Sequence, residues 1–228
     1  MSTFLHKLQS ASPCLIVSIP GNNVDMAKAA EAAGADAVKT HINVTHHASH
    51  LTFGSLEQER PALEKILAAV RIPVGLVPGE DLGISPETVK AITAMGFTFI
   101  DGYAHTLPAW VRGGKLDYWA AINPTYTATE IQHLASLPWV DVIEAAIIPT
   151  EAYGQLLSIR DLARYHELSQ ILTKPFVVPS QRKLRVEDVP SLLAVGAKNL
   201  MIGAVVTGMD VAGVEAVTRA FRRAIDAR

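Results

Sequence analysis

The sequence predicts an α/β fold, namely a single (β/α)8 barrel (a TIM barrel) that occupies residues 1–228 as one domain. Two broad observations lead to this class. Short apolar runs alternate with helical patterns along the whole chain, as in folds made of repeated strand–helix units. Hydrophobic residues form 49% of the chain and charged residues only 18%, which suits a parallel sheet that is buried on both faces.

A third observation is a junction that recurs along the chain. At Gly34, Gly96 and Gly196, a helical pattern stops at a glycine and runs directly into an apolar strand. Glycine suits this place because the residue after a helix end usually has a left-handed backbone. The three glycines lie 62 and 100 residues apart, which corresponds to two and three strand–helix units of about 30 residues each. Eight such units favour a closed barrel over an open, doubly wound sheet.

The predicted strands are apolar runs bounded by glycine, proline or polar residues. In chain order they cover residues 15–20, 35–42, 73–78, 97–103, 118–123, 140–148, 176–179 and 200–206. Helices are expected between them. Four carry their own signals: Asn22 as an N-cap, an apolar face over 63–70, Pro86 at a first helical position, and a capping box of Thr127 with Glu130. A short helix is expected over 107–111, and longer ones over 154–172, 186–195 and 210–227.

Charge and composition exclude several functional classes. The net charge is −2 and no basic stripe occurs, so we expect no nucleic-acid partner. No segment approaches the ~18 apolar residues of a membrane span, and residues 1–13 lack the pattern of a signal peptide. The single cysteine, Cys14, cannot form an internal disulfide. These features indicate a cytoplasmic enzyme, and analogy with small apolar barrels suggests a homodimer that pairs through its outer helices.

Lys39, Asp101 and Glu144 are charged residues inside or at the C-terminal ends of apolar strands. In a closed barrel, catalytic groups lie at the C-terminal ends of strands and in the loops that follow. A buried carboxylate needs a positive partner or a raised pKa, because desolvation penalises its ionised form. Lys39 paired with Asp101 or Glu144 would meet that need and would supply an acid and a base. The alternatives are an ion pair that only fills the barrel and a Lys39 that binds phosphate or carboxylate.

The loops after the seventh and eighth strands are the usual phosphate site of such barrels. Gly203 lets a ligand approach the backbone, and the amide of Ala204 can face an anion. Ser180 and Arg182 follow the seventh strand, where Arg182 offers a guanidinium fork. The sequence therefore predicts phosphate binding by Ser180, Arg182, Gly203 and Ala204. The alternative is that Gly203 and Gly208 are simple turn residues.

Half of the histidines of the chain lie within ten residues, at His41, His46, His47 and His50. Their spacing matches no standard zinc signature, so we expect a polar loop that closes over a ligand, with no metal and no cofactor. A metal-dependent enzyme is the weakest alternative. Four polar residues at or near the ends of strands are expected to contact the substrate: His41, His105, Asn123 and Gln181.

Four stretches of the chain resemble the phosphate-binding barrels, and among them the N-acylmannosamine-6-phosphate 2-epimerase family. These stretches are residues 71–76, 101–105, 177–182 and 202–207. The resemblance implies the barrel fold and a phosphate site, with Lys39 where the family carries an arginine. It does not carry the activity across. The family's catalytic lysine and glutamate correspond to positions near Pro78 and Ser180, and proline cannot act as a base.

The leading hypothesis is an isomerase or epimerase that acts on a phosphorylated sugar or a related small phosphorylated metabolite. Lys39 would act with Asp101 or Glu144 to donate and accept a proton at the mouth of the barrel. One alternative is an aldolase or lyase in which Lys39 forms a Schiff base with a carbonyl substrate. Another is a barrel without catalysis that binds a phosphorylated ligand.

Overall fold

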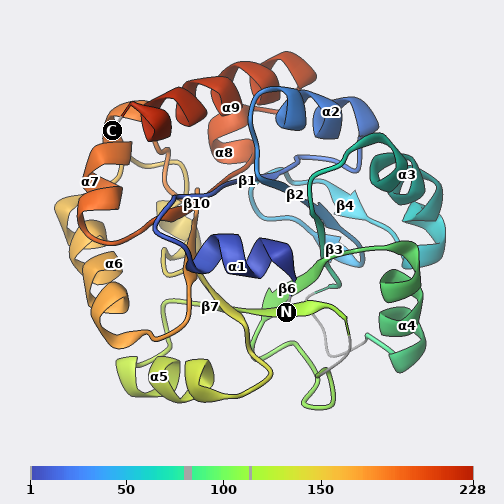
Figure 1. Cartoon of the computed structure of the whole chain (residues 1–228), viewed down its shortest axis with the longest axis horizontal. Coiled ribbons are helices and arrows are strands. Elements are labelled where there is room, and N and C mark those ends of the chain that lie inside the picture. The colour runs from blue at the N-terminus through green and yellow to red at the C-terminus, as the bar shows by residue number, and fades with distance from the viewer. Residues whose placement is uncertain (1, 80–83, 113–114, 228) are drawn as a thin grey trace.

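The computed structural model describes residues 2–79, 84–112 and 115–227. Eight parallel strands close into a barrel in the order β1-β10-β9-β8-β7-β6-β5-β2 (Figure 1), which confirms the predicted fold class. The barrel strands are β1 (Leu15–Ser18), β2 (Ala37–His41), β5 (Val74–Val77), β6 (Phe99–Tyr103), β7 (Asp117–Ile122), β8 (Val142–Ala145), β9 (Phe176–Pro179) and β10 (Asn199–Ile202).

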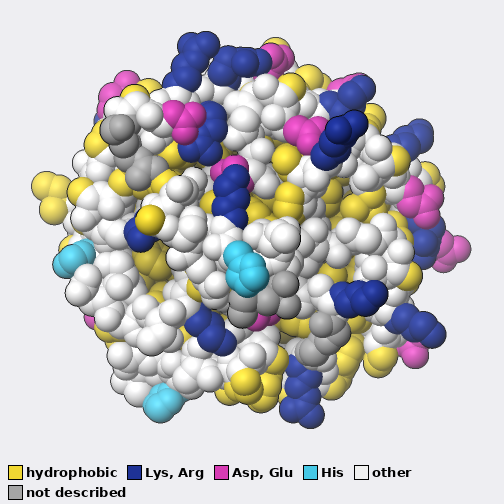
Figure 2. All heavy atoms as spheres, in the orientation of Figure 1, with side chains coloured by type: hydrophobic (Ala, Val, Ile, Leu, Met, Phe, Trp, Pro, Cys, Tyr) yellow, Lys and Arg dark blue, Asp and Glu magenta, His cyan; other side chains and the backbone are white. Residues whose placement is uncertain are grey.

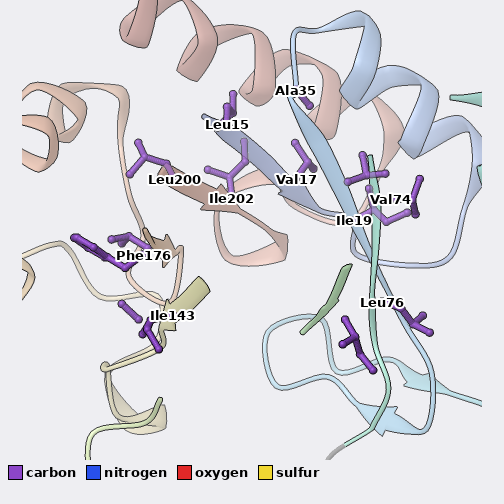
Figure 3. Close-up of a cluster of buried hydrophobic side chains, with 14 of the residues drawn as sticks. Leu15, Val17, Ile19, Ala35, Val74, Leu76, Ile143, Phe176, Leu200 and Ile202 are labelled. Atoms are coloured by element: carbon purple, nitrogen blue, oxygen red, sulfur yellow. The ribbon is translucent and has the colours of Figure 1, made fainter. Parts of the chain in front are cut away.

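Helices form a ring outside the strands (Figure 1). They are α2 (Val24–Ala32), α3 (Leu56–Ala69), α4 (Pro86–Met95), α5 (Ala128–Ser136), α6 (Ile159–Ile171), α7 (Val189–Ala194) and α9 (Val211–Asp226). The three predicted glycine junctions are present, since Gly34, Gly96 and Gly196 have φ values of 98°, 98° and 88°. Side chains that point outward from the strands pack against these helices and form the main hydrophobic core. Figure 3 shows part of this core, with Leu15 of β1 near Leu200 of β10.

The structure corrects the predicted eighth strand. It ends at Ile202, and Ala204–Thr207 form a short helix, α8. Gly203 has an extended backbone and is the N-cap of this helix. Its carbonyl oxygen accepts hydrogen bonds from the amides of both Val206 and Thr207. The β-branched valines suggested a strand, but the local backbone bonds override that propensity. The predicted helix cap is also shifted by one residue, since Asn23 caps α2.

Two predicted helices differ as well. Residues 107–111 form a bend and a turn instead of a helix, and in the turn the amide of Val111 donates to the carbonyl of Pro108. The helix predicted from residue 154 begins only at Ile159, after a capping box of Ser158 with Asp161. A 3-10 turn, η1 (Thr150–Ala152), precedes it. The helix predicted over 186–195 is divided into the turn η2 (Val186–Asp188) and α7.

Two elements were not predicted. The stretch expected to be a polar loop contains a hairpin of β3 (Val44–Thr45) and β4 (Thr52–Phe53). A helix, α1 (Thr3–Gln9), lies across the centre of the ring in Figure 1. Its buried residues are Phe4, Leu5 and Leu8. Figure 2 shows the same face, where basic and acidic side chains are intermixed and do not separate by sign.

The N-terminal end of the barrel interior is an apolar layer beneath α1. It consists of buried side chains from the strands, from α1 and from Cys14 just before β1: Phe4, Leu5, Leu8, Cys14, Ile16, Ala37, Phe99, Trp119, Val142, Val177 and Met201. The rings of Phe99 and Trp119 stack with centroids 4.0 Å apart. Gly75 of β5 adds no side chain here, because a Cβ on it would lie 2.0 Å from the Phe99 ring. This end of the barrel is therefore a packed core.

Within the described ranges, no helix combines the length and the apolar composition that a membrane span requires.

Candidate active site

A pocket occupies the opposite, C-terminal end of the barrel. Along a strand, side chains two residues apart face the same side, so the residues two places after the apolar layer form a second inward layer. That layer lines the pocket through Ser18, Lys39, Val77, Asp101, Ala121, Glu144, Pro179 and Gly203. The pocket encloses about 800 Å³ when the space at its open mouth is included. Four residues of this second layer are polar or charged, namely Ser18, Lys39, Asp101 and Glu144, and we call them the pocket floor. The layer beneath is apolar.

Lys39, Asp101 and Glu144 meet on this floor. The Lys39 Nζ lies 2.8 Å from Asp101 Oδ2 and 2.8 Å from Glu144 Oε2. The three residues are 5%, 1% and 8% exposed. They come from β2, β6 and β8, which closure of the barrel brings around one interior. The predicted pairing of Lys39 with these carboxylates is therefore present, and both carboxylates share the one ammonium group.

Burial and charge push the pKa values of the two carboxyls apart. Burial and the neighbouring Glu144 carboxylate raise the pKa of Asp101 well above its ordinary value, against the opposing effect of Lys39. Burial also raises the pKa of Glu144, but the Lys39 ammonium and a hydrogen bond with Asp101 outweigh burial and lower it. Asp101 therefore keeps its proton at a pH where Glu144 has lost its own. Two carboxyls in such different states can serve as an acid and a base.

Lys39 itself stays charged. Burial lowers its pKa, but the carboxylates of Asp101 and Glu144 outweigh burial and raise the pKa above that of an ordinary lysine. A Schiff base with a carbonyl compound requires the neutral amine. The raised pKa therefore counts against the predicted alternative in which Lys39 is the nucleophile of a lyase.

His41, which the sequence predicts to contact the substrate, lines the pocket beside this cluster. Its Nε2 lies 3.4 Å from the Ser18 Oγ. Its backbone is fixed by Asn22, which accepts from the His41 amide at 3.1 Å and donates to the His41 carbonyl at 2.7 Å. Burial, with smaller contributions from His46 and Lys39, lowers the pKa of His41 well below its ordinary value. The imidazole is therefore neutral at neutral pH.

Three of the four predicted phosphate ligands lie on one wall of the pocket. Ser180, Gly203 and Ala204 all line it. The Ser180 Oγ accepts a hydrogen bond from the Gly203 amide at 2.9 Å, which ties the end of β9 to the start of α8. A Cβ on Gly203 would lie 3.3 Å from the Ser18 carbonyl oxygen, so the absence of a side chain allows this close approach.

Arg182 lies elsewhere, and the prediction for it needs correction. It does not line the pocket. Its guanidinium forms an ion pair with Asp161, at 2.9 Å from Nε and 3.1 Å from one terminal nitrogen. The other terminal nitrogen donates to the Ala152 carbonyl and to Gln155 Oε1, each at 3.2 Å. Asp161 therefore neutralises the guanidinium charge that was predicted to bind the phosphate.

Of the other three residues predicted to contact the substrate, one lines the pocket and two do not. Gln181 lines the pocket, whereas His105 and Asn123 do not. The His105 Nδ1 is 3.1 Å from the Tyr126 hydroxyl, and the Asn123 side chain accepts from the amide and hydroxyl of Thr125. Both residues follow strand ends, but their side chains form local contacts in the loops.

His46 and His47, from the loop predicted to close over a ligand, also line the pocket. Four further lining residues were not predicted to contact a substrate: Ser18, Val44, Tyr103 and Tyr153. Ser18 carried a usable signal, because it interrupts an apolar strand as Lys39 does. Tyr153 carried none, since it lies in a loop without periodic sequence. Among the described residues, no three His, Cys, Asp or Glu side chains are grouped as metal ligands would be. The rings of His41 and His46 pack against each other, with centroids 4.6 Å apart.

The sequence matches no protein-family model and no curated protein. Solved structures match it in fold. The thiamine phosphate pyrophosphorylase of Pyrococcus furiosus has a TM-score of 0.66 at 14% identity, covering 99% of this chain and 98% of that one. The tryptophan synthase A-subunit of the same organism has a TM-score of 0.68 at 13% identity, covering 92% and 97%. The phosphoribosyl anthranilate isomerase of Thermus thermophilus has a TM-score of 0.64 at 15% identity, covering 94% and 98%. All three are similar to this chain in fold.

Proposed function

We propose that this protein is an acid–base isomerase that acts on a small phosphorylated metabolite with a carbonyl group next to a hydroxyl-bearing carbon, such as a phosphorylated sugar. The observation that carries the proposal is the buried group of Lys39, Asp101 and Glu144 on the pocket floor. A purely structural ion pair needs one carboxylate for one ammonium. Here a second carboxyl is present, and its pKa is raised by burial.

Each of the three groups has a role in this reaction. The Glu144 carboxylate removes the proton from the hydroxyl-bearing carbon, and the Asp101 carboxyl protonates the carbonyl oxygen to give an enediol. Glu144 then returns its proton to the former carbonyl carbon while Asp101 takes the proton of the neighbouring hydroxyl, so both groups recover their starting states. Lys39 has three N–H donors, of which one oxygen of the Asp101 carboxyl and one of the Glu144 carboxylate accept two. In the described part of the chain the third is left for the substrate oxygen, on which negative charge develops.

The arrangement favours isomerisation over epimerisation by two bases. Inversion at a carbon by two bases requires them on opposite faces of that carbon. Asp101 and Glu144 are hydrogen-bonded to the same ammonium group at 2.8 Å each, so they meet a substrate from the same side. Proton transfer between adjacent carbons on one face is compatible with that placement.

The proposal places the phosphate of the substrate at the wall formed by the ends of β9 and β10. Supporting it are the Ser180 hydroxyl and the backbone of Ala204 at the start of α8, which line the same pocket. Two of the similar structures have phosphate compounds in their names, a thiamine phosphate pyrophosphorylase and a phosphoribosyl anthranilate isomerase. Against it, Arg182 is paired with Asp161. We therefore assign the phosphate to backbone amides and hydroxyls.

The test is proton exchange with solvent. A panel of aldose and ketose phosphates, each beside its unphosphorylated sugar, is incubated with the protein in D2O and followed by proton NMR. We expect deuterium at the carbon next to the carbonyl of one phosphorylated compound. Glu144→Gln should reduce the rate about 10²- to 10⁴-fold without changing the fold seen by circular dichroism. Binding without exchange would support the barrel without catalysis, and an active Glu144→Gln variant would remove Glu144 as the base.

A further inference from the structure

The loop that leaves β8 is attached to the residues that follow β9. We define this loop as residues 146–157. The amide of Gly154 donates to the Gln181 carbonyl at 2.9 Å, and the amide of Lys183 donates to the Gln155 carbonyl at 2.8 Å. Gly154 has a φ of 74°, a left-handed value that glycine adopts without strain. The chain therefore turns directly after Tyr153, which lines the pocket.

Gln181 fixes the position of the Tyr153 hydroxyl. Its Oε1 accepts from the Ile148 amide at 3.0 Å, and this bond sets which end of the side-chain amide faces the loop. Its Nε2 then donates to the Ala146 carbonyl at 3.2 Å and to the Tyr153 hydroxyl oxygen at 2.6 Å. Gln181 is only 6% exposed. The phenol oxygen is an acceptor in this bond, so its own proton points away from Gln181.

Arg182 holds the same loop from its outer side. It donates to the Ala152 carbonyl and to the Gln155 side chain, which lie on either side of Tyr153 in the sequence. Its anchor is Asp161, which is itself fixed in the capping box at the start of α6. The side chains of Arg182 and Asp161 are 13% and 6% exposed. Arg182 thus connects a helix end to both flanks of Tyr153.

We infer that Tyr153 is a substrate-contacting residue of this pocket and that Arg182 is the residue that positions it. The inference rests on the proposed function, because it takes the pocket to be an active site. A bidentate ion pair and two further hydrogen bonds restrain the loop that presents a hydroxyl and an aromatic ring to the pocket. Arg182 acts through that loop and does not bind the ligand.

The test combines activity with a structural measurement. Tyr153→Phe removes the hydroxyl and keeps the ring, so we expect the kcat/KM of deuterium exchange to fall about 10- to 100-fold, the loss of one substrate hydrogen bond. Arg182→Met should cause a similar fall and should expose residues 153–157 to chymotrypsin. The double variant should be no worse than either single variant. Lys183→Met is the matched control, because it removes an adjacent, exposed positive charge and should change neither measurement.

The outcomes separate the possible roles. Full activity of Tyr153→Phe would overturn the contact. If the double variant loses the product of the two single-variant falls in kcat/KM while the loop stays protected from chymotrypsin, Arg182 contacts the ligand itself. If the wild-type protein exchanges no compound, the proposed function fails, and thermal shifts with ribose 5-phosphate then decide the contact. The contact of Tyr153 with the ligand would be overturned if ribose 5-phosphate gave no thermal shift with the wild-type protein. It would also be overturned if the shift were the same in Tyr153→Phe. Chymotrypsin decides the role of Arg182 in either case.

Discussion

The two ends of the barrel interior are built on the same strands and differ in chemistry. On β2 the inward residues are Ala37 and then Lys39, and on β6 they are Phe99 and then Asp101. The first member of each pair lies in the apolar layer under α1. The second lies on the pocket floor. A step of two residues along a strand therefore separates a packed core from a charged site.

This difference shows how the barrel divides stability from chemistry. Burial of the aromatic layer is favourable in proportion to the apolar area removed from water. The floor holds three buried ionisable groups, which cost free energy unless each is paired. We expect burial at the apolar end to offset the free-energy cost of the buried charges at the pocket end.

The largest change in the free energy of unfolding is expected in the apolar layer under α1. Phe4 packs against Phe99 and Trp119, with ring centroids 5.8 Å and 6.0 Å away. Phe4→Ala should lower the free energy of unfolding by about 3–5 kcal/mol, through lost burial and the cavity that remains. Urea unfolding measures this. The deuterium-exchange rate per folded molecule should stay unchanged, and a parallel loss of activity would show that the two ends are not separate.

Lys39→Met tests the charged end. With the ammonium removed, burial raises the pKa of Glu144 above its unfolded value. A raised carboxyl pKa gives a contribution that is present below the unfolded pKa, about 4.3, and is lost as the pH rises through the folded pKa. The variant should therefore be less stable than the wild type by about 3 kcal/mol at pH 8, and by less at pH 5. Urea unfolding of both proteins at the two pH values measures this, and an equal deficit at both would contradict it.

How much of this division the sequence predicts depends on the kind of contact. Period-2 spacing and apolar runs predict the strands, and charges inside those runs predict the pairing of Lys39, because a buried charge needs a partner in any closed barrel. The partner of Arg182 could not be predicted in this way. Asp161 lies 21 residues earlier in the sequence, and only the path of the intervening loop decides that it pairs with the guanidinium. For α8, local hydrogen bonds override the preference of valine for strands.

The smallest effect concerns acid sensitivity at the pocket end. Burial, with Lys39, His47 and His50, lowers the pKa of His46 to about 4, against the opposing effect of Glu144. A lowered histidine pKa means that the unfolded chain binds a proton first as the pH falls below about 6.5. Stability should therefore decline from pH 6.5 towards pH 4, by about 1–2 kcal/mol at pH 5.

His46→Gln should flatten this decline, although His41, whose pKa is also lowered by burial, contributes in the same direction. Thermal unfolding from pH 7.5 to pH 4.5 measures the slope. His133→Gln is the matched control, since His133 is exposed on α5 and its removal should leave the slope as it is. If His46→Gln keeps the full slope, the acid sensitivity does not arise at this end.

The position of α1 has a consequence for how the chain folds during synthesis. The Leu8 carbonyl accepts a hydrogen bond from Asn199, 191 residues later, and Phe4 packs against strands from the middle of the chain. The helix is thus synthesised before β6, β7 and β10, whose residues complete the surface that it packs on. Until β10 pairs with β1, its apolar residues remain open to other chains, so we expect the nascent protein to depend on chaperones until its final strand has emerged.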